Sequence, residues 1–249
     1  MYKKLRVNDE GMFKEVLRRV RRELEKFPNN PTKFPILLLE VHREVVGGVD
    51  AMKLVSTTAK TLATDGVDQA PTHVIVSCSS AAFALAFDAG GSARQQDVWV
   101  GGFTEHEAQQ LAKFNGCGED DWPKIQPIVA KCDYRAGDVL NACEMLKKGM
   151  APADIEADFR EMADKDAVRF AGLIVEGKSI GRPMLQDLRS NPAGRPAVVN
   201  GTCYEPREIA AEIRTKNAHA VLWHPQKKRY FFASEMHREA AQTLLQGSP

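Results

Sequence analysis

Residues 35–41 read Pro35-Ile-Leu-Leu-Leu-Glu-Val41, a short apolar run that contains a single acid, Glu40. A continuous apolar run of this length predicts a strand buried on both faces, as strands of parallel sheets are. Two later stretches, 72–80 and 97–103, are rich in β-branched and aromatic residues and predict two more strands. The first of these ends in small polar residues, and the second contains a Gly-Gly pair.

Helices are predicted between and around these strands. Apolar residues recur at helical spacing over 10–27 and 50–62. Thr104 and Glu107 have the spacing of a capping box, which predicts that a third helix begins there. The alternation of strands and helices over 30–115 indicates an α/β domain with a parallel sheet.

The character of the chain changes after Gly116. Residues 122–176 have a helical pattern, and residues 180–204, rich in Gly, Pro and Asn, are interpreted as a connector. The end of the chain predicts a helix, two strands and a closing helix capped by Ser234, at 205–217, 218–223, 230–233 and 234–245. This order is typical of a small winged-helix-like module. We therefore divide the chain into a partial α/β domain, a helical segment and a winged-helix-like module, at 1–116, 117–179 and 180–249.

Composition excludes several classes of protein. The 249 residues include 34 Lys and Arg against 33 Asp and Glu, a net charge of +1, which argues against a protein that wraps nucleic acid. No apolar run approaches the roughly 18–20 residues that span a bilayer. The five cysteines are an odd number without a CxxC pair, which argues against a disulfide scaffold and a structural zinc site. The first residues lack the apolar core of a secretion signal, so we expect a protein that is not secreted.

Motifs for catalysis are weak. His106-Glu107 lacks the second histidine of a zinc protease, because position 110 is Gln. Residues 172–179 match the pattern GxxxxGK[ST] of a phosphate loop. Such a loop presents backbone N–H groups to phosphate, and three bulky apolar side chains make a poor cradle. We therefore expect no phosphate loop there, and we interpret Cys78 as a structural cysteine.

Glu40 ends an apolar strand, which is the form of a Walker B motif whose carboxylate holds Mg²⁺. Active versions often add a second acid that polarises water. Val41 follows here, so that base is missing.

The order of these features resembles the C-terminal part of a P-loop ATPase of the AAA+/STAND kind. The ATPase domain of mitochondrial escape proteins is the most similar. The Walker B strand of that family resembles 35–40, its sensor strand 73–80 and its strand before a capped helix 98–108. Its lid resembles 133–139, and its winged helix resembles 205–240. The resemblance implies a P-loop NTPase-like parallel sheet followed by a helical lid and a winged-helix-like module.

The resemblance also implies positions that contact nucleotide: Glu40, Ser77, Ser79, Arg94 and Arg135. The Walker A loop of the family would precede Met1, and Glu40 replaces an Asp. We therefore interpret these positions as vestigial and expect no cofactor and no metal, with ATP and Mg²⁺ bound only if a phosphate loop is supplied elsewhere.

The phosphate-loop strand of the family lies between the sensor strand and the last strand. Its absence predicts one of two arrangements. Strands 72–79 and 97–103 pair directly, or another chain or segment supplies the missing strand, because an open parallel edge exposes unpaired N–H and C=O groups.

Three functions remain open. The first is a non-catalytic, P-loop ATPase-like subunit of a larger intracellular assembly, with protein partners. By resemblance it is mitochondrial, and otherwise cytoplasmic. The second is the C-terminal part of an active ATPase whose phosphate loop comes from a missing segment or a partner. The third is a nucleic-acid-binding winged-helix protein whose wing is Lys227, Lys228 and Arg229.

Overall fold

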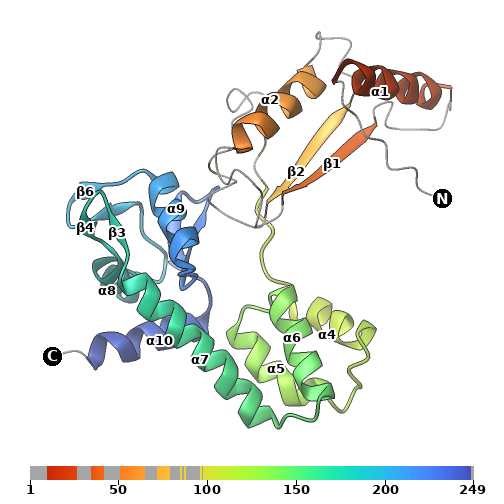
Figure 1. Ribbon diagram of the computed structural model, residues 1–249. Helices are drawn as coiled ribbons and strands as arrows, with labels where there is room; N and C mark the ends of the chain where they lie inside the picture. The colour runs from red at the N-terminus through yellow and green to blue at the C-terminus, as the bar shows by residue number, and fades with distance from the viewer. Residues whose placement is uncertain are drawn as a thin grey trace. The chain divides into compact units, whose positions relative to one another are not determined.

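The computed structural model describes residues 10–26, 35–41, 51–64, 72–78, 85, 87, 96 and 98–247. The chain is mixed α/β and divides into two compact units, 1–96 and 97–249 (Figure 1). Each unit is described by itself.

The first unit contains a two-stranded parallel sheet. Its described elements are α1 (Glu10–Leu24), β1 (Ile36–Val41), α2 (Ala51–Thr64) and β2 (His73–Cys78). The predicted strands at 36–41 and 72–80 and the helices at 10–27 and 50–62 are therefore confirmed as elements. β1 and β2 pair in a register that runs from Ile36 opposite His73 to Val41 opposite Cys78.

One face of this sheet packs on α2. Val41 and Met52 form a buried cluster, and Val55, Val76 and Cys78 pack against it. Val55 and Met52 belong to α2, so this helix supplies the core for the inner face of both strands.

The prediction that β1 is buried on both faces is wrong. Side chains alternate along a strand, and every second residue of β1 and β2 is exposed. Ile36, Leu38 and Ile75 are 59%, 64% and 52% exposed. The outer face of the sheet thus exposes three aliphatic side chains, beside the polar residues Glu40, His73 and Ser77.

The strand predicted at 97–103 is also not found: residues 98–103 belong to no helix or strand and pair with no strand of the described chain. They are held in the second unit instead. The Phe103 N–H donates to the carbonyl oxygen of Tyr134 (3.1 Å). A Cβ on Gly102 would lie 1.7 Å from the carbonyl oxygen of Asp133. The backbone at Gly102 therefore packs directly on the turn that precedes the helix beginning at Ala136. Direct pairing of 72–79 with 97–103, the first of the two predicted arrangements, is therefore not formed by the described residues, 72–78 and 98–103.

The second unit is mainly helical. Its helices are α4 (Glu105–Phe114), α5 (Trp122–Lys131), α6 (Ala136–Lys147), α7 (Pro152–Ala171), α8 (Gly181–Ser190), α9 (Pro206–Lys216) and α10 (Glu235–Gln246). Its strands form three antiparallel hairpins: β3 (Ile174–Val175) with β4 (Lys178–Ser179), β5 (Val198–Val199) with β6 (Thr202–Cys203), and β7 (Val221–His224) with β8 (Arg229–Phe232).

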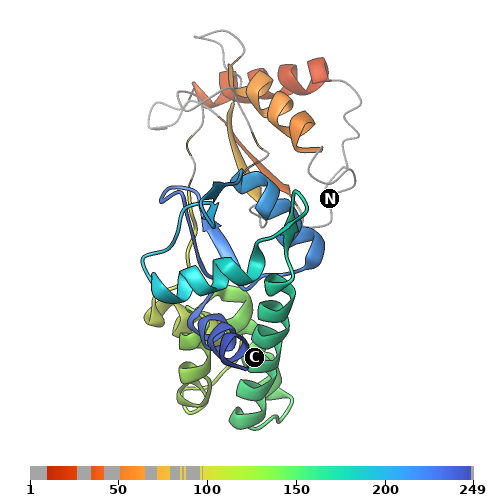
Figure 2. The same cartoon turned by 90° about the vertical axis from the view of Figure 1, so that its left-hand side faces the viewer.

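Helix α7 organises this unit. Helices α4, α5 and α6 gather around one end of α7, and α8, α9 and the small hairpins gather around the other (Figures 1 and 2). Its buried side chains recur at helical spacing: Ile155, Phe159, Ala163, Ala167 and Phe170. Helix α10 packs along α7 with Met236, Ala240 and Ala241 buried. This shared core explains why the two halves of the unit form one body.

Part of the connector predicted over 180–204 is a helix, α8. Pro183 is its third residue. Proline is tolerated in the first turn because the N–H groups there have no helical partner. The prediction is wrong for 181–190, because prolines close to Gly and Asn typically interrupt helices, whereas Pro183 lies in the first turn, where proline is compatible with a helix.

The order predicted for the end of the chain is confirmed as helix, hairpin and helix: α9, β7–β8 and α10. Asn217 ends α9 in the left-handed region, with φ of 51°. The Ser234 hydroxyl accepts a hydrogen bond from the His237 N–H and caps α10, as predicted.

Candidate functional site

Glu40 and Ser77 lie side by side in the first unit. They are opposite each other in the parallel register of β1 and β2. Both are exposed, on the same outer face as Ile36, Leu38 and Ile75. The structure therefore brings together two of the positions that the resemblance implied, at the carboxyl end of an open apolar sheet face.

Among the other implied positions, the structure describes Arg135. Arg135 lies in the second unit, where its Nε donates to the carboxylate of Asp138 (2.7 Å) at the start of α6. This ion pair occupies the guanidinium locally. Ser79 and Arg94 fall outside the described residues.

The phosphate-loop pattern at 172–179 folds as a hairpin. Ile174 pairs with Ser179 and Val175 with Lys178. Glu176 and Gly177 form the two-residue turn with φ of 49° and 74°, as the tight turns of antiparallel hairpins require. A phosphate loop instead passes from a strand to a helix N-terminus with its amides free. Here Lys178 lies on the second strand of the hairpin, and the Ile180 N–H donates to Leu173.

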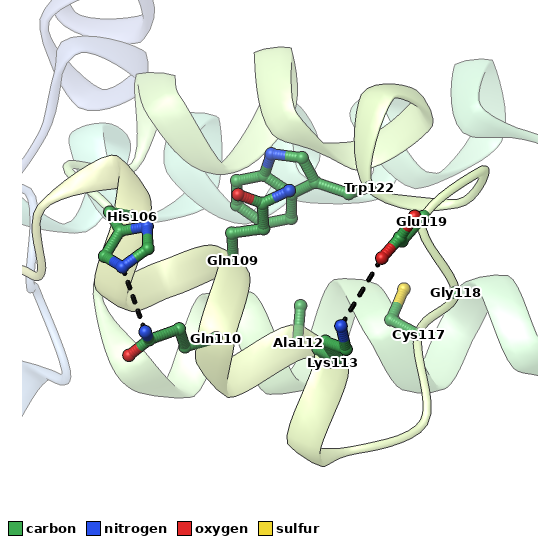
Figure 3. A pocket seen from close by; sticks show the side chains of 9 residues that line it. All are labelled: His106, Gln109, Gln110, Ala112, Lys113, Cys117, Gly118, Glu119 and Trp122. Carbon is green, nitrogen blue, oxygen red and sulfur yellow. Dashed lines mark hydrogen bonds and ion pairs between the residues drawn. The ribbon is translucent and has the colours of Figure 1, made fainter.

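A cavity of about 370 Å³ lies beside α4 (Figure 3). Helix α4 supplies His106, Gln109, Gln110, Ala112 and Lys113, and the following loop and α5 supply Cys117, Gly118, Glu119 and Trp122. An ion pair between Lys113 and Glu119 (3.4 Å) joins the two sides. Gln110 and His106 hydrogen-bond to each other (2.9 Å). The lining offers polar contacts around one indole ring, with its histidine bonded to an amide rather than to a nucleophile.

The buried thiols are poor nucleophiles. Burial, together with the nearby Asp138 carboxylate, raises the pKa of Cys132 to about 12. Burial likewise raises the pKa of Cys143 to about 12, helped by a hydrogen bond with Cys117. Cys78 is half-buried against the α2 cluster, and burial raises its pKa too. Since the thiolate is the reactive form, these cysteines are structural. Within the described part of the chain, no cluster of three or more His, Cys, Asp or Glu could hold a metal ion.

A group of rings on the β7–β8 hairpin is a feature that the motifs did not predict. Trp99 stacks on His224, with ring centroids 5.0 Å apart and an angle of 27° between the planes. The Lys227 ammonium lies 5.1 Å from the centre of the Phe231 ring. The sequence signal was the pairing of basic and aromatic residues in 223–232, but Trp99 is too distant in sequence to be associated with them.

Comparison with known proteins finds no matching family model, curated protein or solved structure. No described helix is both long enough and apolar enough to cross a membrane. The site assignments therefore depend on the geometry above.

Proposed function

We propose that this chain is a non-catalytic, P-loop ATPase-like protein that serves as a structural or interaction subunit of a larger assembly inside the cell, in the mitochondrion or the cytoplasm. The observation that carries the proposal is the open apolar face of the β1–β2 sheet. Ile36, Leu38 and Ile75 expose more than half of their side chains there.

Parallel sheets are normally covered on both faces, and a sheet of two strands is marginal by itself. Burial of one large aliphatic side chain contributes about 1.5–3 kcal/mol. Covering three of them therefore offsets part of the entropy that association costs. A partner polypeptide with an apolar surface fits this face. A partner strand also fits an edge of the sheet with which no described strand pairs, which is the second of the two arrangements predicted for the missing strand.

The finer architecture belongs to the same proposal. The parallel pair with Glu40 and Ser77 at its carboxyl end corresponds to part of a P-loop ATPase sheet. The order α9, β7–β8, α10 corresponds to a winged helix, and α5–α7 to a helical lid. The hairpin at 174–179 and Val41 after Glu40 support a protein without nucleotide chemistry.

The role of the sheet face is tested by size-exclusion chromatography of a native extract, which measures the apparent size of the chain. A tagged full-length chain with Leu38→Asp should elute as the free chain, whereas the wild type elutes with the assembly. Leu54→Asp is the matched control, because Leu54 is 72% exposed on α2 and lies on another element. Assembly that survives Leu38→Asp together with Ile75→Asp would contradict this role for the face.

Nucleotide chemistry is tested separately by calorimetric titration of the purified chain with Mg-ATP. We expect no binding at micromolar concentrations. Tight, Mg²⁺-dependent binding by the chain alone would overturn the non-catalytic assignment. Binding that arises only in the assembly would instead favour an active ATPase whose phosphate loop comes from a partner.

A further inference from the structure

The β7–β8 hairpin has one buried face and one face of rings and cations. Trp223 and Tyr230 pair across the strands and point inward, 7% and 0% exposed. The residues that alternate with them pair on the opposite, outward face: Leu222 with Phe231, and His224 with Arg229. This outward face is partly exposed.

The rings on this face are arranged in sequence. Trp99, 36% exposed, stacks on His224 at 5.0 Å, and His224 lies 6.0 Å from Phe231 at an angle of 58°. Lys227 extends over Phe231. Lys228 and Arg229 complete the basic tip of the hairpin, and Arg229 donates to the carbonyl oxygen of Ala193 (3.3 Å).

The hairpin belongs to a basic stretch of the sequence. Residues 172–230 contain ten Lys and Arg against five Asp and Glu, a net charge of +5. Residues 117–171 contain eight against twelve, a net charge of −4. The near-neutral total of the chain therefore conceals a basic segment at 172–230, which is complementary to a polyanion.

We propose that Trp99, His224 and Phe231, with Lys227, Lys228 and Arg229, form a binding face for single-stranded nucleic acid. Unpaired bases stack on aromatic rings, and cations neutralise the phosphates between them. The bases of a duplex are stacked on one another and cannot use the rings. An acidic peptide would pair with the cations but would not need the rings. This site goes beyond the proposed function, since it lies in the second unit and uses none of the sheet residues.

The probes are fluorescein-labelled oligo-U and oligo-dT of about 12 nucleotides, which is within the site size of one small domain. Fluorescence anisotropy with the full chain at about 50 mM salt should detect binding that weakens steeply as salt rises. A duplex of equal length should bind more weakly than either single strand. A preference for oligo-U over oligo-dT identifies RNA as the ligand, and equal affinity identifies a site for either single strand.

Two variants separate stacking from charge. Trp99→Ala should weaken single-strand binding about tenfold, and Trp99→Phe should largely retain it. The double variant Lys227→Gln, Lys228→Gln should reduce the salt dependence of binding. Lys165→Gln should not, because Lys165 is an exposed lysine of the acidic segment 117–171.

Three results would overturn the proposal: no binding at low salt, equal affinity for duplex and single strand, or affinity unchanged by Trp99→Ala while the lysine variants weaken it. A purified protein partner that binds through Trp99 in the absence of nucleic acid would also overturn the proposal, because it would assign the face to protein contact. None of these results affects the sheet-face test, which concerns Leu38 and Ile75.

Discussion

Thr104 and Glu107 fix the start of α4 by reciprocal hydrogen bonds. The Glu107 N–H donates to the Thr104 hydroxyl (3.3 Å), and the Thr104 N–H donates to the Glu107 carboxylate (2.8 Å). Thr104→Ala should therefore lower the free energy of unfolding by about 1 kcal/mol, measured by urea denaturation. Thr104→Ser keeps the acceptor and should cost much less; equal losses for both variants would assign the effect to packing of the methyl group.

The same capping box predicts a pH dependence. Hydrogen bonds from the Thr104 backbone and side chain lower the pKa of Glu107. A lowered folded-state pKa stabilises the protein at pH above the ordinary value of 4.5, and this contribution is lost as pH falls through the lowered value. The stability difference between wild type and Glu107→Ala should thus shrink as pH falls below 4.5. A difference that is constant over this range would contradict the ionised capping box.

Cysteine reactivity tests the burial of the thiols. Cys203 is exposed, whereas Cys132 and Cys143 are buried, with pKa values raised to about 12. Alkylation of the native protein at pH 7.5 should modify Cys203 first. Mass spectrometry of the peptides measures which cysteines have reacted. Rapid modification of Cys132 or Cys143 in native protein would show that the α5–α6 core opens readily.

Elements were predictable where local chemistry decides them. The apolar run at 36–41, the capping box at Thr104 and the cap at Ser234 each act over a few residues, and each was confirmed. The strand at 97–103 was not formed, because strand pairing needs a partner, and Gly102 instead packs on the Asp133 carbonyl group. Of the candidate site, the sequence predicted the two strands that carry Glu40 and Ser77, but not that these strands pair. It could not place Trp99 beside His224, since that contact depends on tertiary packing.

Two glycines test how the segment before α4 is held. Gly102→Ala should destabilise the second unit by more than 1 kcal/mol, because the new methyl group would overlap the Asp133 carbonyl group. Gly137→Ala, in the first turn of α6 with nothing within 4 Å of the added carbon, should stabilise it by about 0.5–1 kcal/mol. Thermal unfolding of both variants measures the contrast, and a harmless Gly102→Ala would mean that the segment does not pack on this turn.

At the scale of the whole molecule, the two units differ in how much of their apolar surface is buried. The second has its own core along α7 and α10, with an ion-pair cluster in which Lys131 and Arg160 contact Glu156 and Glu239. Residues 97–249 expressed alone should therefore unfold in one cooperative transition by calorimetry. A broad, non-cooperative transition would show that this unit needs residues 1–96 to fold.

The first unit exposes apolar side chains on one face of the β1–β2 sheet, and we propose that this face binds a partner in an assembly. The most direct measurement is hydrogen–deuterium exchange of β1 and β2 in the full chain, alone and within its native assembly. We expect the amides of 36–41 and 73–78 to exchange at least about tenfold more slowly in the assembly, since a partner would cover the face and pair with its edge. Equal exchange in the two states, with the assembly intact, would contradict it.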